Sequence, residues 1–179
     1  MFDVSGPINE RTSKAHGYEL NLQHNFGESG FGVILNKTWA YADAEYDPNT
    51  AYQTEETAAG TTLVPVEQFA LAGLSDSANF IGFFDKDGVN VRIAYNWRDD
   101  FFGGIGQDQG SRSLNPNHTQ EYGQWDISAS YEINDNLTIF MDGINVNEEY
   151  FKTYGRVKSQ PLVMGQTGAR YNLGLRYTF

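Results

Sequence analysis

The chain has 179 residues, the size of one domain, and no cysteine, which excludes a disulfide scaffold and a thiolate metal site. Its formal net charge of −11 argues against nucleic acid as a partner and against a basic helix on a membrane surface. No apolar run approaches the roughly 20 residues of a membrane-spanning helix, and no basic, apolar signal peptide opens the sequence. Membrane-spanning strands are not detected by a search for long apolar runs, because only alternate residues of such a strand face lipid.

Seven segments alternate apolar and polar residues, which is the pattern of a β-strand with one apolar and one polar face. Most have the roughly 9–11 residues that cross a bilayer on a slant. The last segment shows the pattern most clearly, because the apolar Tyr171, Leu173, Leu175, Tyr177 and Phe179 alternate with polar residues that include Arg170 and Arg176. In chain order the predicted strands are 15–26, 31–41, 78–84, 89–99, 124–133, 137–147 and 169–179.

Three features interrupt this pattern. His24 and Lys37 fall on the apolar faces of the first two segments, near strand ends where a long or amphipathic side chain reaches the membrane interface. Segment 137–147 changes phase around Asp142-Gly143, which predicts a β-bulge there. Segment 78–84 is short, and its phase stays open.

The connections between the segments alternate strictly in length. Tight turns at 27–30, 85–88 and 134–136 alternate with long connections at 42–77, 100–123 and 148–168. Short periplasmic turns and long extracellular loops are typical of an outer-membrane barrel. This orientation places all three tryptophans, Trp39, Trp97 and Trp125, at the outer ends of their strands, as expected for an interfacial aromatic girdle.

Four stretches carry a family resemblance: "GPINERTSKAHGYELNLQHNF", "GLSDSANFIGFFDKDGVNVRIAYNWRDDF", "YGQWDISASYEINDNLTIFMDGINVNEEY" and the terminal "LGLRYTF". Together they resemble the C-terminal barrel of TonB-dependent outer-membrane receptors. Within that family, their residues are most similar to those of the carbohydrate-type branch. The resemblance implies an all-β, antiparallel transmembrane barrel segment of about seven strands, part of a 22-stranded barrel that holds an N-terminal plug. Residues 1–14 are then an extracellular loop remnant and 15–179 the barrel. The sequence shows no plug and no TonB box, so a fragment is expected.

The resemblance also implies a function. Such receptors bind a scarce nutrient, an oligosaccharide or a siderophore-like compound, and import it with TonB energy coupling through the plug; a fragment is expected to be inactive alone. The implied partners are outer-membrane lipid and lipopolysaccharide, the barrel-assembly machinery, the TonB complex and the nutrient, with no cofactor and no enzymatic activity. Two alternatives stay open: a passive or structural small outer-membrane barrel, and a soluble carbohydrate-binding β-sandwich.

Three groups of residues are candidates for these roles. Aromatic residues in the long connections offer ring faces to a ligand: Tyr46, Tyr52, Phe69, Phe101, Phe102 and Tyr122. Lumen-facing arginines are candidates for contact with the plug: Arg92, Arg98, Arg170 and Arg176. The resemblance implies an assembly signal in the final strand: Tyr171, Leu173, Leu175, Tyr177 and Phe179.

Two short motifs do not support other chemistry. "DKDG" (85–88) lacks the later ligands of a calcium loop and fits a hairpin turn instead. "GGIGQDQG" (103–110) has neither the spacing of a phosphate-binding loop nor a following strand-to-helix unit. His16, His24 and His118 do not cluster in the sequence pattern, so no metal site or catalytic triad is predicted.

Overall fold

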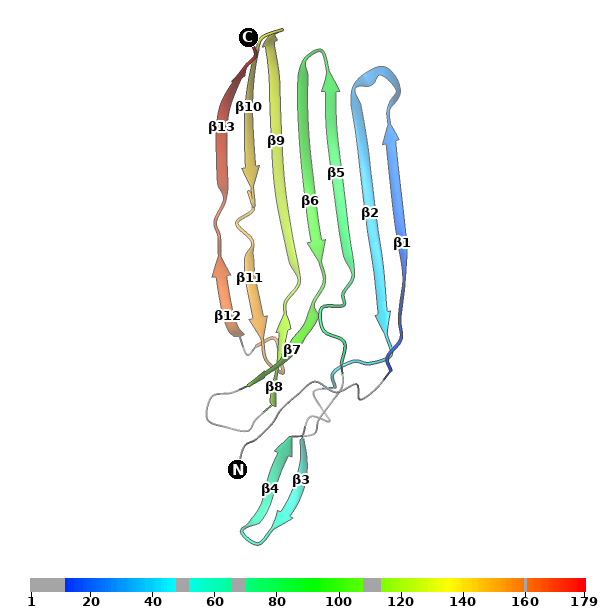
Figure 1. Ribbon diagram of the computed structural model, residues 1–179, viewed down its shortest axis with the longest axis vertical. Coiled ribbons are helices and arrows are strands. Elements are labelled where there is room, and N and C mark those ends of the chain that lie inside the picture. Colours follow the sequence, from blue (N-terminus) through cyan, green and yellow to red (C-terminus); the bar gives the residue numbers. More distant parts are fainter. Residues whose placement is uncertain (1–11, 48–51, 66–69, 108–113, 160) are drawn as a thin grey trace.

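Seven long strands form the main sheet of the computed structural model, which describes residues 12–47, 52–65, 70–107, 114–159 and 161–179. Neighbouring strands of this sheet, called the wall below, are antiparallel and follow one another in chain order (Figure 1). The wall therefore has the up-and-down topology expected for a barrel segment. Its strands are β1 (Ala15–Asn25), β2 (Phe31–Ala42), β5 (Ser77–Lys86), β6 (Val89–Arg98), β9 (Tyr122–Asn134), β10 (Leu137–Ile144) and β13 (Arg170–Tyr177).

The strand register places most of the apolar residues of the seven strands on one face of the wall. One row of cross-strand partners reads Leu22, Leu35, Phe80, Tyr95 and Trp125. Successive side chains of a strand point to opposite faces, so the adjacent row belongs to the other face, and it is polar: Asn21, Asn36, Asn79, Asn96 and Gln124. The register also decides the open phase of segment 78–84, since Phe80 shares the apolar face with Leu35.

No second layer covers the apolar face over the part of the chain that the structure describes. Tyr18 is 69% exposed and Leu173 is 78% exposed, whereas the buried hydrophobic residues of the wall, Ile81 and Ala94, lie on the polar face. Apolar surface in water costs about 25 cal/mol per Å², and an uncovered patch of this kind marks a membrane or protein interface. A single uncovered sheet does not fit the two-layered β-sandwich alternative.

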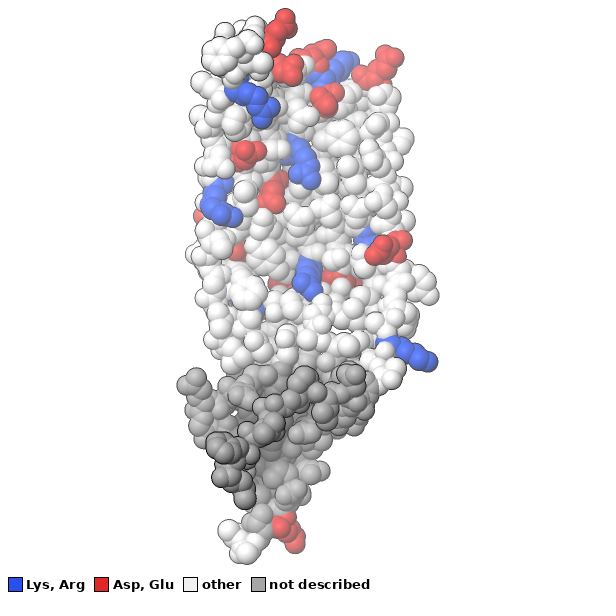
Figure 2. Space-filling view, in the orientation of Figure 1, with Lys and Arg blue, Asp and Glu red and all other residues white. Residues whose placement is uncertain are grey.

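Tight turns join the wall strands at one end. Between β5 and β6 the turn residues Asp87 and Gly88 both have positive φ, 54° and 76°. That conformation belongs to the two-residue type I′ turn, for which Asp-Gly is a preferred pair. The hairpin interpretation of "DKDG" is thereby confirmed, and Figure 2 shows that charged side chains gather at this end of the wall.

The long connections at the other end contain strands that the alternation pattern did not reveal. A separate hairpin pairs β3 (Tyr52–Thr57) with β4 (Gly60–Pro65). A four-stranded sheet has the order β12-β11-β8-β7 and lies beyond the loop end of the wall (Figure 1). Its strands are β7 (Phe101–Gln107), β8 (Leu114–Thr119), β11 (Tyr150–Tyr154) and β12 (Pro161–Gln166).

The predicted bulge at Asp142-Gly143 is wrong. Both residues keep a continuous register with β9 and β13, and β10 ends two positions beyond Asp142, at Ile144. The phase instead changes at Asn145, which has a φ of 55°. Asparagine tolerates this left-handed conformation better than most residues, so the chain turns there without disturbing the ladder.

Lys37 lies on the apolar face, as its position in the alternation predicted. Its Nζ atom is 3.4 Å from Oδ2 of Asp76 and 4.5 Å from the ring centroid of Trp97. The ion pair and the aromatic ring together offset the cost of placing an ammonium group near lipid. In the described residues no helix is long and apolar enough to cross a membrane.

Candidate functional site

An aromatic cluster at the loop end is the main candidate for ligand contact. Tyr46 and Phe102 stack with ring centroids 5.2 Å apart and planes 6° from parallel. His118 and Tyr154 form a second stacked pair, at 5.0 Å and 12°. Phe102 meets His118 edge-on at 5.5 Å, so the two pairs form one continuous group. Stacked and edge-on contacts of this kind stabilise a fixed arrangement of ring faces.

The loop-end sheet brings these rings together. Phe102 on β7 is the cross-strand partner of His118 on β8, and His118 is in turn the partner of Tyr154 on β11. Partners directly opposite one another on a sheet have their side chains in contact range. Tyr46 comes from the chain that leaves β2, and His118 is fixed further because its Nδ1 lies 3.0 Å from the Gly155 carbonyl oxygen, which accepts its hydrogen.

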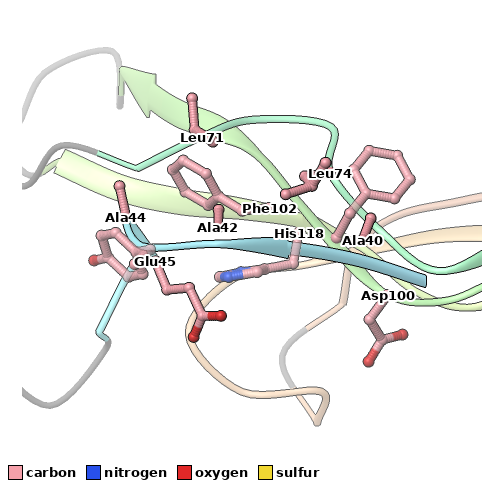
Figure 3. Close-up of a pocket in the computed structure, with 11 residues that line it drawn as sticks. Ala40, Ala42, Ala44, Glu45, Leu71, Leu74, Asp100, Phe102 and His118 are labelled. Atoms are coloured by element: carbon pink, nitrogen blue, oxygen red, sulfur yellow. The ribbon is translucent and has the colours of Figure 1, made fainter. Parts of the chain in front are cut away.

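A cavity of about 230 Å³ opens beside this cluster. Figure 3 shows Phe102 and His118 on its walls, with the small side chains of Ala42 and Ala44 along β2 and the chain that follows it. The carboxylates of Glu45 and Asp100 also line it. The cavity therefore combines aromatic ring faces with carboxylate hydrogen-bond acceptors.

Asp100, in the lining of the cavity, connects three segments of the loop end through its carboxylate. Its carboxylate forms an ion pair with Lys158 and accepts a hydrogen bond from the backbone N–H of Glu121. The Tyr154 hydroxyl lies 3.5 Å from Oδ2, the same oxygen that pairs with Lys158, whereas the Glu121 N–H bonds to Oδ1. Burial and, next, the charge of Asp100 raise the pKa of Tyr154, and the hydrogen bond to Asp100 raises the pKa of Lys158. Both side chains therefore keep their protons at neutral pH.

The structure separates the predicted ligand residues into different places. Tyr46 and Phe102 belong to the aromatic cluster, and Phe101 lines the same cavity. Tyr122 lies apart from it and donates a hydrogen bond from its hydroxyl to Gln124 Oε1 at 2.7 Å. Tyr52 begins β3, and Phe69 lies outside the described residues. His118 and Tyr154 were missed, because no local pattern connects residues on separate strands.

The four candidate arginines all lie on the polar face or at its loop-end margin. Arg98 donates from Nε to Ser75 Oγ at 2.8 Å and from Nη2 to the Gly73 carbonyl oxygen at 2.5 Å. It thereby holds the 73–75 segment, which also bonds to Phe102 through Gly73 N–H. Arg176 lies over the Phe140 ring at 5.9 Å, while Arg92 and Arg170 are exposed.

A ladder of side-chain amides crosses five strands on the polar face. Nδ2 of Asn21 donates to Asn36, that of Asn36 to Asn79 at 3.4 Å, and that of Asn79 to Asn96 at 2.6 Å. Asn96 donates to Oδ2 of Asp126 at 3.2 Å, which ends the ladder on a carboxylate. Each side-chain amide donates a hydrogen bond to the side chain on the next strand. The ladder therefore gives the wall a polar lining and stabilises the register of the strands against slippage.

Asp126 also joins the ladder to the loop end. Its Oδ1 atom accepts hydrogen bonds from Gln124 Nε2 at 2.6 Å and from the backbone N–H of Asn145 at 2.9 Å. Asn145 is only 1% exposed, and its side chain bonds to both the backbone N–H and the carbonyl of Glu149. One carboxylate therefore holds the residue at which the chain leaves the wall.

The last strand, β13, lies at an edge of the wall. Among the described residues it pairs with β10 alone, and its apolar residues lie on the uncovered face. The Phe179 ring is fully exposed and meets Tyr177 edge-on at 5.1 Å. Thr178 is held to the β9–β10 turn by two hydrogen bonds with Asn136, at 2.9 and 2.7 Å. The ring is thus positioned but uncovered.

Comparison with known proteins agrees with this architecture. The chain matches the family model described as "TonB dependent receptor-like, beta-barrel" over residues 3–146, which spans β1 to β10. No curated protein and no solved structure matches the chain. The predicted strands, their single uncovered apolar face and the family match lead to one conclusion: the chain belongs to the TonB-dependent receptor β-barrel family of the bacterial outer membrane.

Proposed function

We propose that the aromatic cluster and its cavity form part of the ligand site of a receptor that imports a scarce nutrient with TonB energy coupling. The observation that carries this proposal is the joining of two stacked ring pairs, contributed by Tyr46, Phe102, His118 and Tyr154, beside a cavity lined with carboxylates. Aromatic faces stack on the C–H faces of sugars or on the rings of a siderophore, and carboxylates accept hydroxyl hydrogens. An oligosaccharide or a siderophore-like compound fits this chemistry.

The proposed orientation puts the loop end outside the cell. Outer-membrane barrels have short periplasmic turns and long extracellular loops, and the long connections of this chain all lie at the end that carries the cavity. A nutrient would then meet the ring cluster before it reaches the lumen. The polar face of the wall becomes the lumen lining, with Arg92, Arg98, Arg170 and Arg176 toward a plug domain.

The chain alone is proposed to be inactive in transport. The wall has two edges, β1 and β13, that pair with no further strand among the described residues. An open sheet edge in a membrane leaves backbone N–H and C=O groups unsatisfied, so further strands are needed to close a barrel. Transport also needs the plug through which the TonB complex acts, and only the complete receptor that carries this chain would supply it.

The first prediction tests the ligand site. Phe102→Ala and Tyr46→Ala are each expected to weaken ligand binding about 10- to 100-fold, because burial of one aromatic ring is worth about 1.5–3 kcal/mol. Binding is measured on whole cells with a fluorescent malto-oligosaccharide and with a ferric catecholate siderophore as probes. Phe151→Ala is the control, since Phe151 lies on β11 near Tyr154 but is 46% exposed and outside the cluster. Equal losses in all three variants would contradict the proposed site.

The second prediction tests orientation. The chain has no cysteine, so single cysteines can be introduced without background labelling from it. Cysteines at the exposed positions Ala72, Glu121 and Val157 are expected to react with an impermeant thiol reagent on intact cells. Cysteines at Ser29, Lys86 and Asp135, in the tight turns, are expected to react only after the outer membrane is opened. The opposite pattern would refute the orientation.

A further inference from the structure

A short segment without regular secondary structure, residues 71–76 and called the strap below, is bonded to both chains that carry the first stacked ring pair. The N–H of Leu71 donates to the carbonyl oxygen of Ala44, in the chain that follows β2, at 3.1 Å. The N–H of Gly73 donates to the carbonyl oxygen of Phe102, on β7, at 2.8 Å. The strap therefore joins the two chains directly beside the rings that stack on one another.

The strap turns between these two hydrogen bonds, at Gly73. This residue has a φ of 79°, in the region that favours glycine. A methyl group at this position would meet no atom within 4 Å, so the backbone conformation and not lack of space requires glycine here. A residue with a side chain would strain the turn, and the N–H that bonds to Phe102 would shift with it.

Arg98 holds the strap from the polar face of β6. Its Nη2 donates to the carbonyl oxygen of Gly73 at 2.5 Å, and its Nε donates to Oγ of Ser75 at 2.8 Å. The guanidinium carbon also lies 4.0 Å from the ring centroid of Phe101, within the range of a cation–π contact. The planar guanidinium presents its donors in a fixed geometry, so one side chain orients both the strap and the start of β7.

Asp76 fixes the other end of the strap. Its Oδ1 accepts the N–H of Ala40 on β2 at 3.0 Å, and its Oδ2 pairs with Nζ of Lys37 at 3.4 Å. Its carbonyl oxygen accepts the N–H of Asp99, which follows β6, at 3.0 Å. Because this end is bound to strands on both sides, the turn at Gly73 is the part of the strap whose position depends on Arg98.

From these contacts we propose that Arg98 is a positioning residue for the ligand site. Through Gly73 it sets the place of Phe102 and therefore the stacking of the first ring pair, and the strap that it holds lines the cavity with Leu71 and Leu74 (Figure 3). The inference rests on the ligand site given under Proposed function. Contact of Arg98 with a plug predicts a different result, because it would change the rate of uptake and not the geometry of the rings.

The first test measures this geometry without a ligand. The chain has no cysteine, so Tyr46→Cys combined with Phe102→Cys places two thiols at the stacked positions of the complete receptor. The rate at which a mild oxidant joins them on whole cells reports how closely the two chains are held. Arg98→Ala and Gly73→Ala are each expected to slow formation of this disulfide at least fivefold. Arg98→Lys keeps a cation that can donate to the Gly73 carbonyl, so it is expected to slow the reaction less than Arg98→Ala.

Two matched controls accompany this test. Arg92→Ala removes a guanidinium from the same strand and the same polar face. Gly168→Ala introduces a side chain at another glycine with a positive φ, 67°, where a methyl group also meets no atom within 4 Å. Both are expected to change the rate less than twofold. An unchanged rate in Arg98→Ala, or equal slowing by Gly73→Ala and Gly168→Ala, would overturn the inference.

The second test measures uptake of the two probes named above, per receptor at the cell surface. Arg98→Ala is expected to raise the half-saturation concentration about fivefold at an unchanged maximal rate. It is expected to add less than twofold to the loss caused by Phe102→Ala, because it acts through that residue. A lower maximal rate at an unchanged half-saturation concentration indicates plug contact and contradicts the inference. If Arg98→Ala slows disulfide formation but Phe102→Ala leaves probe binding unchanged, Arg98 does position Phe102 and the proposed ligand site fails.

Discussion

Phe179→Ala is expected to lower the amount of receptor in the outer membrane at least fivefold. The ring is fully exposed at the end of the chain and held by Tyr177 and by the hydrogen bonds of Thr178, so it is presented rather than buried. The edge of β13 next to it has no strand partner among the residues that the structure describes. A partner that adds a strand to such an edge gains main-chain hydrogen bonds and fills pockets with alternate side chains, which is the recognition proposed for the barrel-assembly machinery.

Phe84→Ala is the matched control for this prediction. Phe84 lies on the apolar face at the same tight-turn end and packs against Phe31 with ring centroids 4.8 Å apart. Its loss removes apolar contact at the membrane interface but leaves the terminal edge intact. Surface receptor is measured by antibody labelling of intact cells and by fractionation of the outer membrane. If both variants lower the receptor equally, the tail has no special role in assembly.

Asp126→Ala is expected to lower the free energy of unfolding of the receptor by about 2–4 kcal/mol. The change removes a carboxylate that accepts hydrogen bonds from Asn96, Gln124 and the Asn145 backbone. Leaving a buried N–H without a partner costs about 1–3 kcal/mol, and a hydrogen bond to a charged group contributes about 1.5–3 kcal/mol. Unfolding is followed by urea titration of the receptor refolded in detergent.

Asp142→Ala provides the comparison. Asp142 lies on the same polar face, on the neighbouring β10, and its side chain makes no hydrogen bond among the described residues. It is expected to change the free energy of unfolding by less than about 1 kcal/mol, as a substitution away from a network does. Asp126→Asn keeps an acceptor for Asn145 and is expected to recover part of the stability. If Asp142→Ala lowered the free energy of unfolding as much as Asp126→Ala, the stabilisation would come from the negative charge and not from the hydrogen-bonded ladder.

The alternation of residues determined the wall by itself. Each strand needs only a period of two to define its faces, and that information is local, so the positions of the seven wall strands were predicted, together with the apolar faces of the segments whose alternation is unbroken. The tight turns could also be predicted from the sequence, since a pair such as Asp87-Gly88 favours the backbone conformation of a two-residue hairpin turn. Where a residue broke the pattern without a local cause, as Lys37 did, its partners Asp76 and Trp97 were found only in the structure.

Only the tertiary structure decided the phase of segment 78–84, the turn at Asn145 and the strands of the loop end. A short segment takes its face from the strand that pairs with it, and Asn145 depends on an Asp126 that lies 19 residues earlier in the chain. The ring cluster is the extreme case, because Tyr46, Phe102, His118 and Tyr154 come from four separate segments. Their contact follows from the pairing of β7, β8 and β11, and pairing between distant segments leaves no periodic signal along the sequence.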